Sequence, residues 1–115
     1  MLRILIKFKD SVLRVLETDK EEVTIGRNLK NDIQIDNLAV SSFHARVSRK
    51  LGHYFIEDLD STNGTFVDDR RVTKWGLSDN DAVTVGKHTL VFLIEENRDG
   101  AGGRVAIEEL DMDRT

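Results

Sequence analysis

Apolar residues recur at every second position in short runs along this chain, and this spacing limits the possible fold more than any other feature. In the first run, Leu2, Ile4, Ile6 and Phe8 alternate with positions that are mostly charged. A period of two residues is that of a β-strand with one face toward a core, whereas a helix requires a period near 3.6. No stretch keeps a helical period over the length that a stable isolated helix needs. The chain is therefore expected to be built from β-strands.

Turn-forming residues separate these runs at close and regular intervals. A hairpin is expected over residues 2–16, with its turn at residues 9–11. Many short strands divided by turns favour two packed sheets, so we predict an all-β fold, an antiparallel β-sandwich of two twisted sheets. The other expected strands are residues 22–25, 33–35, 45–48, 54–57, 66–67, 70–72, 83–85 and 89–94.

A chain of 115 residues has room for one domain with a modest core, expected at residues 1–97. From Arg98 onward the composition changes to a glycine-rich linker and an acidic tail, so residues 98–115 are expected to be disordered. The first run alternates apolar and charged residues, unlike a secretory signal, and no apolar run is long enough to cross a bilayer. We expect a cytoplasmic protein without a membrane partner.

Charge and composition exclude several classes of function. The formal net charge is −4 at pH 7, which disfavours nucleic-acid binding because backbone phosphates require an excess of basic residues. The chain has no cysteine, which excludes disulfides, thiol catalysis and cysteine-based zinc sites. His44, His53 and His88 lie far apart in the sequence. We therefore expect neither a metal nor a cofactor.

Three clusters of polar residues fall where turns between strands are expected. The first is Gly26 with Arg27, the second reads Ser-Ser-Phe-His-Ala at residues 41–45, and the third reads Ser-Thr-Asn-Gly-Thr at residues 61–65. Together they supply a guanidinium, several hydroxyls, an amide and loop N–H groups. One arginine with such donors can hold a single phosphate whatever the net charge of the chain. The clusters can act together only if all three lie at one end of the sandwich.

The order and content of these clusters resemble the forkhead-associated (FHA) family of phosphothreonine-binding modules. The family pattern is Gly-Arg, then Ser-Arg-x-His-Ala, then Ser-x-Asn-Gly-Thr, and only Ser42 departs from it, where the family has arginine. The resemblance extends from about Leu2 to Glu96. It implies a sandwich with recognition loops at one end and a non-catalytic module for phosphorylation-dependent protein–protein interaction in signalling.

The resemblance also implies a role for each matched residue. The phosphate-binding residues are Arg27, Ser41, Ser42 and Thr62, with Arg27 as the permanent cation. Asn63 would bond the peptide backbone beside the phosphothreonine. The residues that would form the scaffold of the loops are Gly26, His44, Gly64 and Thr65.

Several of these residues also have an ordinary structural explanation. Arg27 alone suits an exposed turn, serine and threonine in loops often bond local backbone, and Asn63 followed by Gly64 is a strong hairpin-turn pattern. Ser42 leaves less positive charge near the phosphate, and Arg46 or Lys30 is a candidate replacement. An FHA fold that no longer binds phosphate is therefore the alternative function.

A hydrolase that uses Ser41 and His44 is a third possibility, but no strained Gly-x-Ser-x-Gly turn accompanies them. We predict that the chain is not an enzyme. The expected partner is a protein or peptide that a Ser/Thr kinase has phosphorylated, and the tail of the chain itself is a second candidate if Thr115 is phosphorylated. Candidate readers of the peptide around the phosphothreonine are Ala39, Val40 and residues 68–72, with Arg70 or Arg71 favouring an acidic neighbour.

Overall fold

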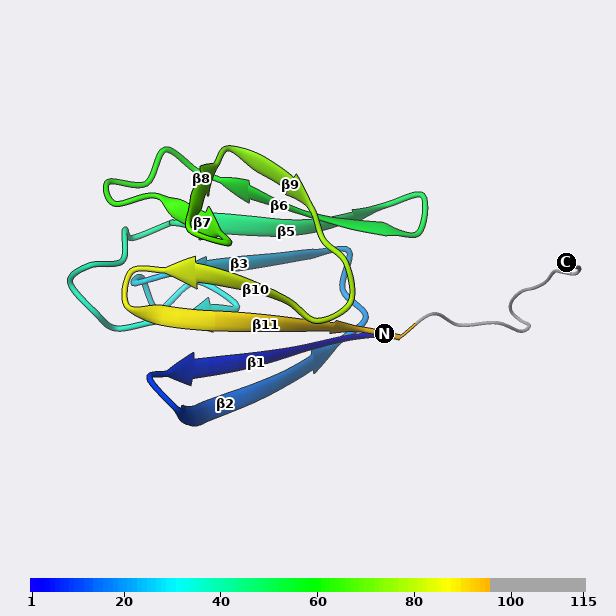
Figure 1. Cartoon of the computed structure of the whole chain (residues 1–115), viewed down its shortest axis with the longest axis horizontal. Coiled ribbons are helices and arrows are strands. Elements are labelled where there is room, and N and C mark those ends of the chain that lie inside the picture. Colours follow the sequence, from blue (N-terminus) through cyan, green and yellow to red (C-terminus); the bar gives the residue numbers. More distant parts are fainter. Residues whose placement is uncertain (96–115) are drawn as a thin grey trace, which may run out of the picture.

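The computed structural model describes residues 1–95, which form eleven strands and no helix (Figure 1). No segment of this part of the chain is a helix of the length and apolarity needed to cross a membrane. The predicted linker and tail, including Thr115, lie outside the described residues. The strands are β1 (Leu2–Phe8), β2 (Ser11–Thr18), β3 (Glu22–Gly26), β4 (Ile33–Gln34), β5 (Ala45–Lys50), β6 (His53–Asp58), β7 (Thr65–Val67), β8 (Arg70–Val72), β9 (Lys74–Gly76), β10 (Asp81–Val85) and β11 (His88–Ile94).

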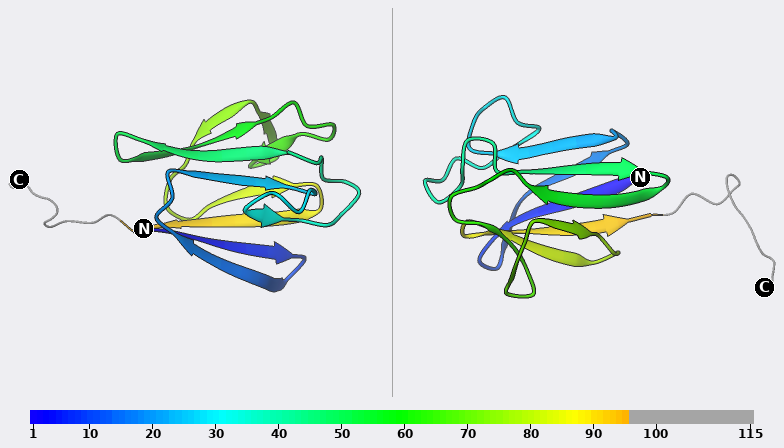
Figure 2. Two further views of the ribbon diagram at one scale, coloured as in Figure 1. Left: turned by 180° about the vertical axis from the view of Figure 1, so that it is seen from behind. Right: turned by 90° about the horizontal axis from the view of Figure 1, so that it is seen from above.

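The strands form two sheets that face each other (Figures 1 and 2). One sheet has six strands in the order β2-β1-β11-β10-β7-β8, and the other has five in the order β4-β3-β5-β6-β9. The predicted all-β sandwich is confirmed. The first and last described strands, β1 and β11, are neighbours in register from Leu2 beside Ile94 to Phe8 beside His88.

The core lies between the sheets and follows the alternation of the sequence. On β1, Leu2, Ile4 and Ile6 are at most 4% exposed, while the intervening side chains face outward. Ile4 lies beside Phe92 of β11, and both are fully buried. Burial of large aliphatic and aromatic side chains in this pattern is the main stabilising contribution to a small sandwich, about 1.5–3 kcal/mol for each such side chain.

Two hairpin turns, between β5 and β6 and between β7 and β8, take the backbone conformation that tight turns require. Leu51 and Gly52 have φ of 53° and 80°, and Asp68 and Asp69 have φ of 50° and 63°. Positive φ at both central residues is typical of the two-residue turns that match the twist of paired strands. Aspartate tolerates this conformation better than most residues.

The structure corrects the sequence analysis at two strands. Strand β9 was not expected, since it has a single half-buried side chain, Trp75, and depends on pairing with Ile56 of β6. Strand β4 pairs with β3 in parallel, with Ile25 beside Ile33, although antiparallel sheets were expected. The loop of residues 27–32 folds back along β3 until Asp32 is hydrogen-bonded to Thr24, which lies within β3. Strand β4 starts from there and runs in the same direction as β3.

The loops that contain the three polar clusters lie at the end of the sandwich away from Met1 (Figure 1). The chain leaves β3 at Gly26 and enters β5 at Ala45, and it leaves β6 at Asp58 and enters β7 at Thr65. Because β6 and β7 belong to different sheets, the loop with Asn63 and Gly64 crosses between sheets and closes no hairpin. The hairpin explanation of this dipeptide is therefore wrong.

Candidate phosphopeptide site

A pocket of ≈ 300 Å³ lies between these loops. All five predicted contact residues line it, together with Leu38, Ala39 and Val40. The four predicted scaffold residues are buried and do not line the pocket. The predicted contact residues are Arg27, Ser41, Ser42, Thr62 and Asn63. The structure thus brings the three clusters together at one pocket, although the binding role of each residue stays a prediction.

Arg27 is held by its backbone and by one nitrogen of its side chain. Its N–H donates to the carbonyl oxygen of Ser41 at 2.9 Å, and its Nε donates to the carbonyl oxygen of Val40 at 3.0 Å. Within residues 1–95, its terminal NH₂ groups make no hydrogen bond and no carboxylate forms an ion pair with it. A guanidinium held in this way can offer its two terminal nitrogens to an anion.

Gly26, the last residue of β3, lets the loop of Ser42 pass directly over the strand. A Cβ at position 26 would overlap the carbonyl oxygen of Ser42 and would lie 2.7 Å from Nδ2 of Asn31. The backbone bonds that tie Arg27 and Asn28 to the neighbouring loop begin at this position. Close approach of two backbones is therefore what requires glycine here.

Gly26→Ala is expected to destabilise the domain by more than about 2 kcal/mol, because the methyl group forces two backbone segments apart. Gly76→Ala is the matched control, since its Cβ would meet only Phe55, at an ordinary 3.7 Å. Urea unfolding followed by tryptophan fluorescence measures both. Equal midpoints for the two variants would contradict the close approach at Gly26.

Asn31 is a scaffold residue that the sequence analysis missed. Its side chain is 7% exposed, and its Nδ2 donates to the carbonyl oxygens of Asn28 and Ser42, both at 2.8 Å. These bonds fix the loop after Arg27 against the loop of Ser42. An asparagine in a polar loop carries no periodic pattern, so only the folded backbone identifies this role.

Ser41 and the third cluster are linked directly. The Oγ of Ser41 accepts a hydrogen bond from the N–H of Thr62 at 3.0 Å, so the hydroxyl hydrogen of Ser41 can still be donated to a ligand. The Nδ2 of Asn63 donates to the carbonyl oxygen of Ala39 at 2.9 Å. This leaves the side-chain oxygen of Asn63 as an acceptor, which is the group that an N–H of a bound peptide would need.

His44 is fully buried and braces two loops. Its Nδ1 accepts a hydrogen bond from the N–H of Ser41 at 3.1 Å, and its Nε2 lies 2.9 Å from the carbonyl oxygen of Gly64. Because a carbonyl can only accept, Nε2 carries a proton, and because Nδ1 accepts from an N–H, it carries none, so the ring is neutral. Both ring nitrogens are engaged with backbone, and neither bonds the hydroxyl of Ser41. This geometry is that of a scaffold histidine and not of a catalytic base.

Asp58 holds the third cluster in place through hydrogen bonds, a role that was not predicted from the sequence. Its carboxylate accepts hydrogen bonds from the hydroxyls of Ser61 and Thr65 and from the N–H of Ser61. The Oγ of Ser61 in turn accepts from the N–H of Gly64 at 2.9 Å. Burial works to raise the pKa of Asp58, but these hydrogen bonds outweigh it and hold the pKa below its ordinary value.

Asp58→Asn is expected to lower stability at neutral pH by about 1–2 kcal/mol and to flatten the acid side of the stability profile. Since the folded-state pKa of Asp58 is depressed, its contribution is present above about pH 4 and is lost as pH falls through that folded-state pKa. Thermal melts from neutral to acidic pH measure this, with Asp60→Asn, an exposed neighbour, as control. Parallel profiles for the native chain and Asp58→Asn would contradict it.

The candidates for replacing the missing family arginine differ in position. Arg46 is an outward residue of β5 that pairs with Glu57 at 2.8 Å and with Glu22 at 3.6 Å, and it does not line the pocket. Lys30 lies in the loop that is bonded to Ser42 through Asn28, and it forms no ion pair within residues 1–95. Of the two, only Lys30 belongs to a recognition loop without an acidic partner.

The residues predicted to contact the peptide around the phosphothreonine lie at two different places. Ala39 and Val40 line the pocket, whereas Arg70 and Arg71 do not. Arg71 lies against the third cluster, where its Nη2 is 3.4 Å from the carbonyl oxygen of Ser61. A peptide that extends from the pocket across this cluster would pass Arg71.

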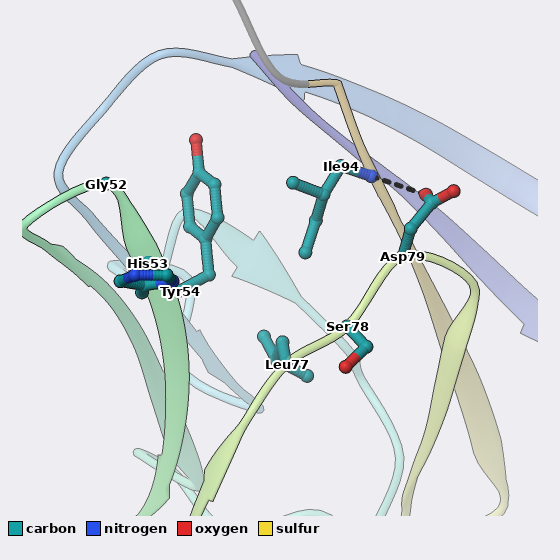
Figure 3. Close-up of a pocket in the computed structure, with 7 residues that line it drawn as sticks. All are labelled: Gly52, His53, Tyr54, Leu77, Ser78, Asp79 and Ile94. Atoms are coloured by element: carbon teal, nitrogen blue, oxygen red, sulfur yellow. Dashed lines mark hydrogen bonds between the residues drawn. The ribbon is translucent and has the colours of Figure 1, made fainter. Parts of the chain in front are cut away.

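A larger pocket of ≈ 520 Å³ is formed where the turn after β5 faces the end of β11 (Figure 3). Figure 3 shows Tyr54 upright between Gly52 and Ile94, with Leu77 below them. In the described part of the chain, no arginine or lysine lines it, and Asp79 uses one carboxylate oxygen to accept the N–H of Ile94 at 2.8 Å. Without a cation, this pocket does not suit a phosphate. Within residues 1–95, no group of three or more histidine or acidic side chains is placed to hold a metal ion.

Comparison with known proteins identifies the family. A family model described as the FHA domain matches residues 23–86, which include all three clusters and the strands between them. The chain belongs to the FHA domain family. The resemblance inferred from the three clusters is thereby confirmed.

Two curated proteins illustrate what this FHA domain is similar to in sequence. The oxoglutarate dehydrogenase inhibitor of Corynebacterium diphtheriae is 37% identical over 75 residues, which are 65% of this chain and 52% of that protein. The glycogen accumulation regulator GarA of Mycolicibacterium smegmatis is 34% identical over 84 residues, 73% of this chain and 53% of that protein. The chain therefore spans about half the length of the curated relatives that it matches.

Solved structures of FHA domains share the fold. Mycobacterium tuberculosis EmbR, solved in complex with a low-affinity phosphopeptide, superposes with a TM-score of 0.72 and 30% identity over 80% of this chain and 24% of that one. An FHA domain solved in a study of phosphothreonine-dependent interactions superposes with a TM-score of 0.72 at 24% identity, over 81% of this chain and 97% of that one.

Proposed function

We propose that this FHA domain binds a phosphothreonine segment of a partner protein and performs no catalysis. The observation that carries the proposal is the guanidinium of Arg27, held by Nε with its terminal nitrogens free of protein partners in the described chain, in one pocket with the hydroxyls of Ser41 and Thr62. A phosphothreonine carries about −1.5 to −2 charges and three acceptor oxygens, which require this combination of cation and short donors.

Known proteins similar to this chain support the same function. EmbR was solved in complex with a phosphopeptide, GarA is named as a regulator of glycogen accumulation, and the corynebacterial relative is named as an inhibitor of oxoglutarate dehydrogenase. By analogy, the partner of this chain is a protein phosphorylated by a Ser/Thr kinase. Both ring nitrogens of His44 are engaged with backbone groups and not with the hydroxyl of Ser41, which agrees with a binding module.

The test is a fluorescence-anisotropy titration with peptides selected from an oriented phosphothreonine library. The phosphothreonine peptide is expected to bind at least about 100-fold more tightly than its unmodified form, because one charged and two neutral hydrogen-bonding groups contribute about 3–5 kcal/mol. Phosphoserine is expected to bind about 4-fold less tightly, since it lacks one buried methyl group worth about 0.8 kcal/mol. Equal affinity for the phosphorylated and unmodified peptides would exclude the function.

A second candidate function rests on Ser42. Its side chain makes no hydrogen bond within residues 1–95 and brings no charge to the pocket, where the family pattern has arginine. A domain of this kind would bind an unphosphorylated partner through its sheet faces. Capture of the same partner before and after phosphatase treatment, unaffected by a change at Arg27, would favour this alternative.

A further inference from the structure

Strand β2 is the longest of the four edge strands of the sandwich. It spans eight residues and pairs only with β1 within residues 1–95, whereas the edge strands β4, β8 and β9 have two or three residues each. One side of the β2 backbone therefore presents N–H and C=O groups that have no strand partner in the described chain. Such groups can form hydrogen bonds with the backbone of another extended strand.

Four of the eight side chains of β2 are apolar, and its two charges are one arginine and one glutamate, although edge strands are often protected by lysine or proline. Val12, Leu13 and Val15 are each at least half exposed. The strand contains neither lysine nor proline. Its register with β1 shifts at Leu13, which has no partner there, so the bulge protects only the end near the turn. From Arg14 onward the strand is regular, so Arg14, Val15 and Leu16 of two copies can pair with each other.

Val15 ends an apolar row that crosses the outer face of the six-stranded sheet. The register places Val15 beside Leu5, Leu5 beside Val91, and Val91 beside Ala82. None of these four outward side chains is buried. Because the row reaches the edge at Val15, a strand added there would extend the same apolar surface.

We propose that a second copy of this chain pairs with β2 edge to edge, antiparallel, about a two-fold axis at Val15. A two-fold axis brings β2 of one copy against β2 of the other, so the unpaired N–H and C=O groups of each strand can bond those of its copy. An axis at Val15 places the two valines opposite each other and joins the two apolar rows. An axis at Arg14 or Glu17 would oppose like charges, and one at Leu16 would set Val15 against Glu17.

Charge agrees with self-pairing. The strand from Ser11 to Thr18 carries one arginine and one glutamate, so two copies meet as neutral strands although the whole chain carries −4. Glu17 is already paired with Arg3 of β1 at 2.6 Å on the same outer face. The edge thus adds no net electrostatic repulsion to the contact.

Pairing in this orientation has a consequence for binding, which, unlike the dimer itself, rests on the proposed function. The turn between β1 and β2 lies at the same end of the sandwich as the recognition loops (Figure 1). Antiparallel pairing therefore places the two phosphopeptide pockets at opposite ends of the dimer. The dimer would join two separately phosphorylated partners and would not grip two nearby sites on one short peptide.

Sedimentation velocity of the full chain from low micromolar to several hundred micromolar tests the proposal. The average mass is expected to rise toward twice that of one chain. Val15→Lys is expected to keep the chain monomeric, because two ammonium groups would meet at the axis, while Leu51→Lys, which replaces a 98% exposed leucine in a turn, should leave the dimer intact. A native chain that stays monomeric, or a dimer that Val15→Lys does not weaken, overturns it.

Disulfide cross-linking tests the proposed dimer even if Val15→Lys fails to fold. The chain has no cysteine, so Val15→Cys introduces a single thiol that meets its own copy at the axis. Opposite Cβ atoms in paired strands lie about 4.5–5.5 Å apart, close to disulfide range. Mild oxidation should cross-link Val15→Cys and not Leu51→Cys, and equal yields overturn the proposal. Phosphopeptide affinity is measured separately, so a monomer that binds phosphothreonine refutes only the dimer.

Discussion

Arg27→Ala is expected to weaken binding of the phosphothreonine peptide by more than about 100-fold. Among residues 1–95, Arg27 is the only cation that lines the pocket, and truncating one partner of a desolvated, hydrogen-bonded charge pair costs about 2–5 kcal/mol. Affinity for the unmodified peptide should change little, so the difference between the two peptides should nearly disappear. Anisotropy titrations of both peptides against the same variant measure this.

Two further arginine variants make the result specific. Arg27→Lys keeps the charge but loses the planar fork, so it should bind with intermediate affinity. Arg46→Ala removes an arginine that pairs with Glu57 and Glu22 outside the pocket, and it should bind like the native chain. Native-like discrimination between the peptides by Arg27→Ala would mean that the phosphate binds elsewhere.

His44→Ala is expected to lower the free energy of unfolding by about 3–5 kcal/mol and the melting temperature by more than about 10 °C. The change leaves a cavity where a fully buried ring was, and it leaves the N–H of Ser41 and the carbonyl of Gly64 without partners. Each buried group left unpaired costs about 1–3 kcal/mol. Phosphopeptide affinity should fall as well, since the ring joins the loops of Ser41 and Thr62.

Calorimetry of His44→Ala beside His53→Ala measures the effect. His53 is an exposed residue at the start of β6, and its replacement should leave the melting temperature nearly unchanged. If both histidine variants melt within a few degrees of the native chain, His44 does not brace the loops. Loss of stability with full retention of phosphopeptide affinity would separate its structural role from any effect on the pocket.

The sequence predicted most strands because a strand with one buried face imposes its own alternation. The runs at Leu2–Phe8 and His88–Ile94 show this, and the turn at residues 68–69 has the residues that positive φ requires. Strand β9 carries no such pattern, because its three residues are positioned by pairing with β6. A strand that depends on its neighbour leaves no local pattern to read.

The residues of the candidate site likewise fall into those that the sequence predicted and those that only the structure reveals. Five of the eight residues that line the pocket belong to motif positions and were predicted from the sequence. The residues that hold them in place were missed where they act through backbone groups of distant loops, as Asn31 does toward Ser42 and Asp58 toward Ser61 and Thr65. Hydrogen bonds of this kind depend on which loops meet, and no spacing rule in the sequence encodes that.

By itself, the sequence determined that the chain forms a β-sandwich and that one guanidinium, two hydroxyls and an amide are available for a phosphate. Only the tertiary structure decided that Arg27, Ser41 and Thr62 share one pocket, that His44 is a neutral brace, and that β2 is left as an open edge. The physical reason is that alternation and turn preference act between near neighbours in the chain. The meeting of loops and the order of strands in a sheet are set by packing of the whole core.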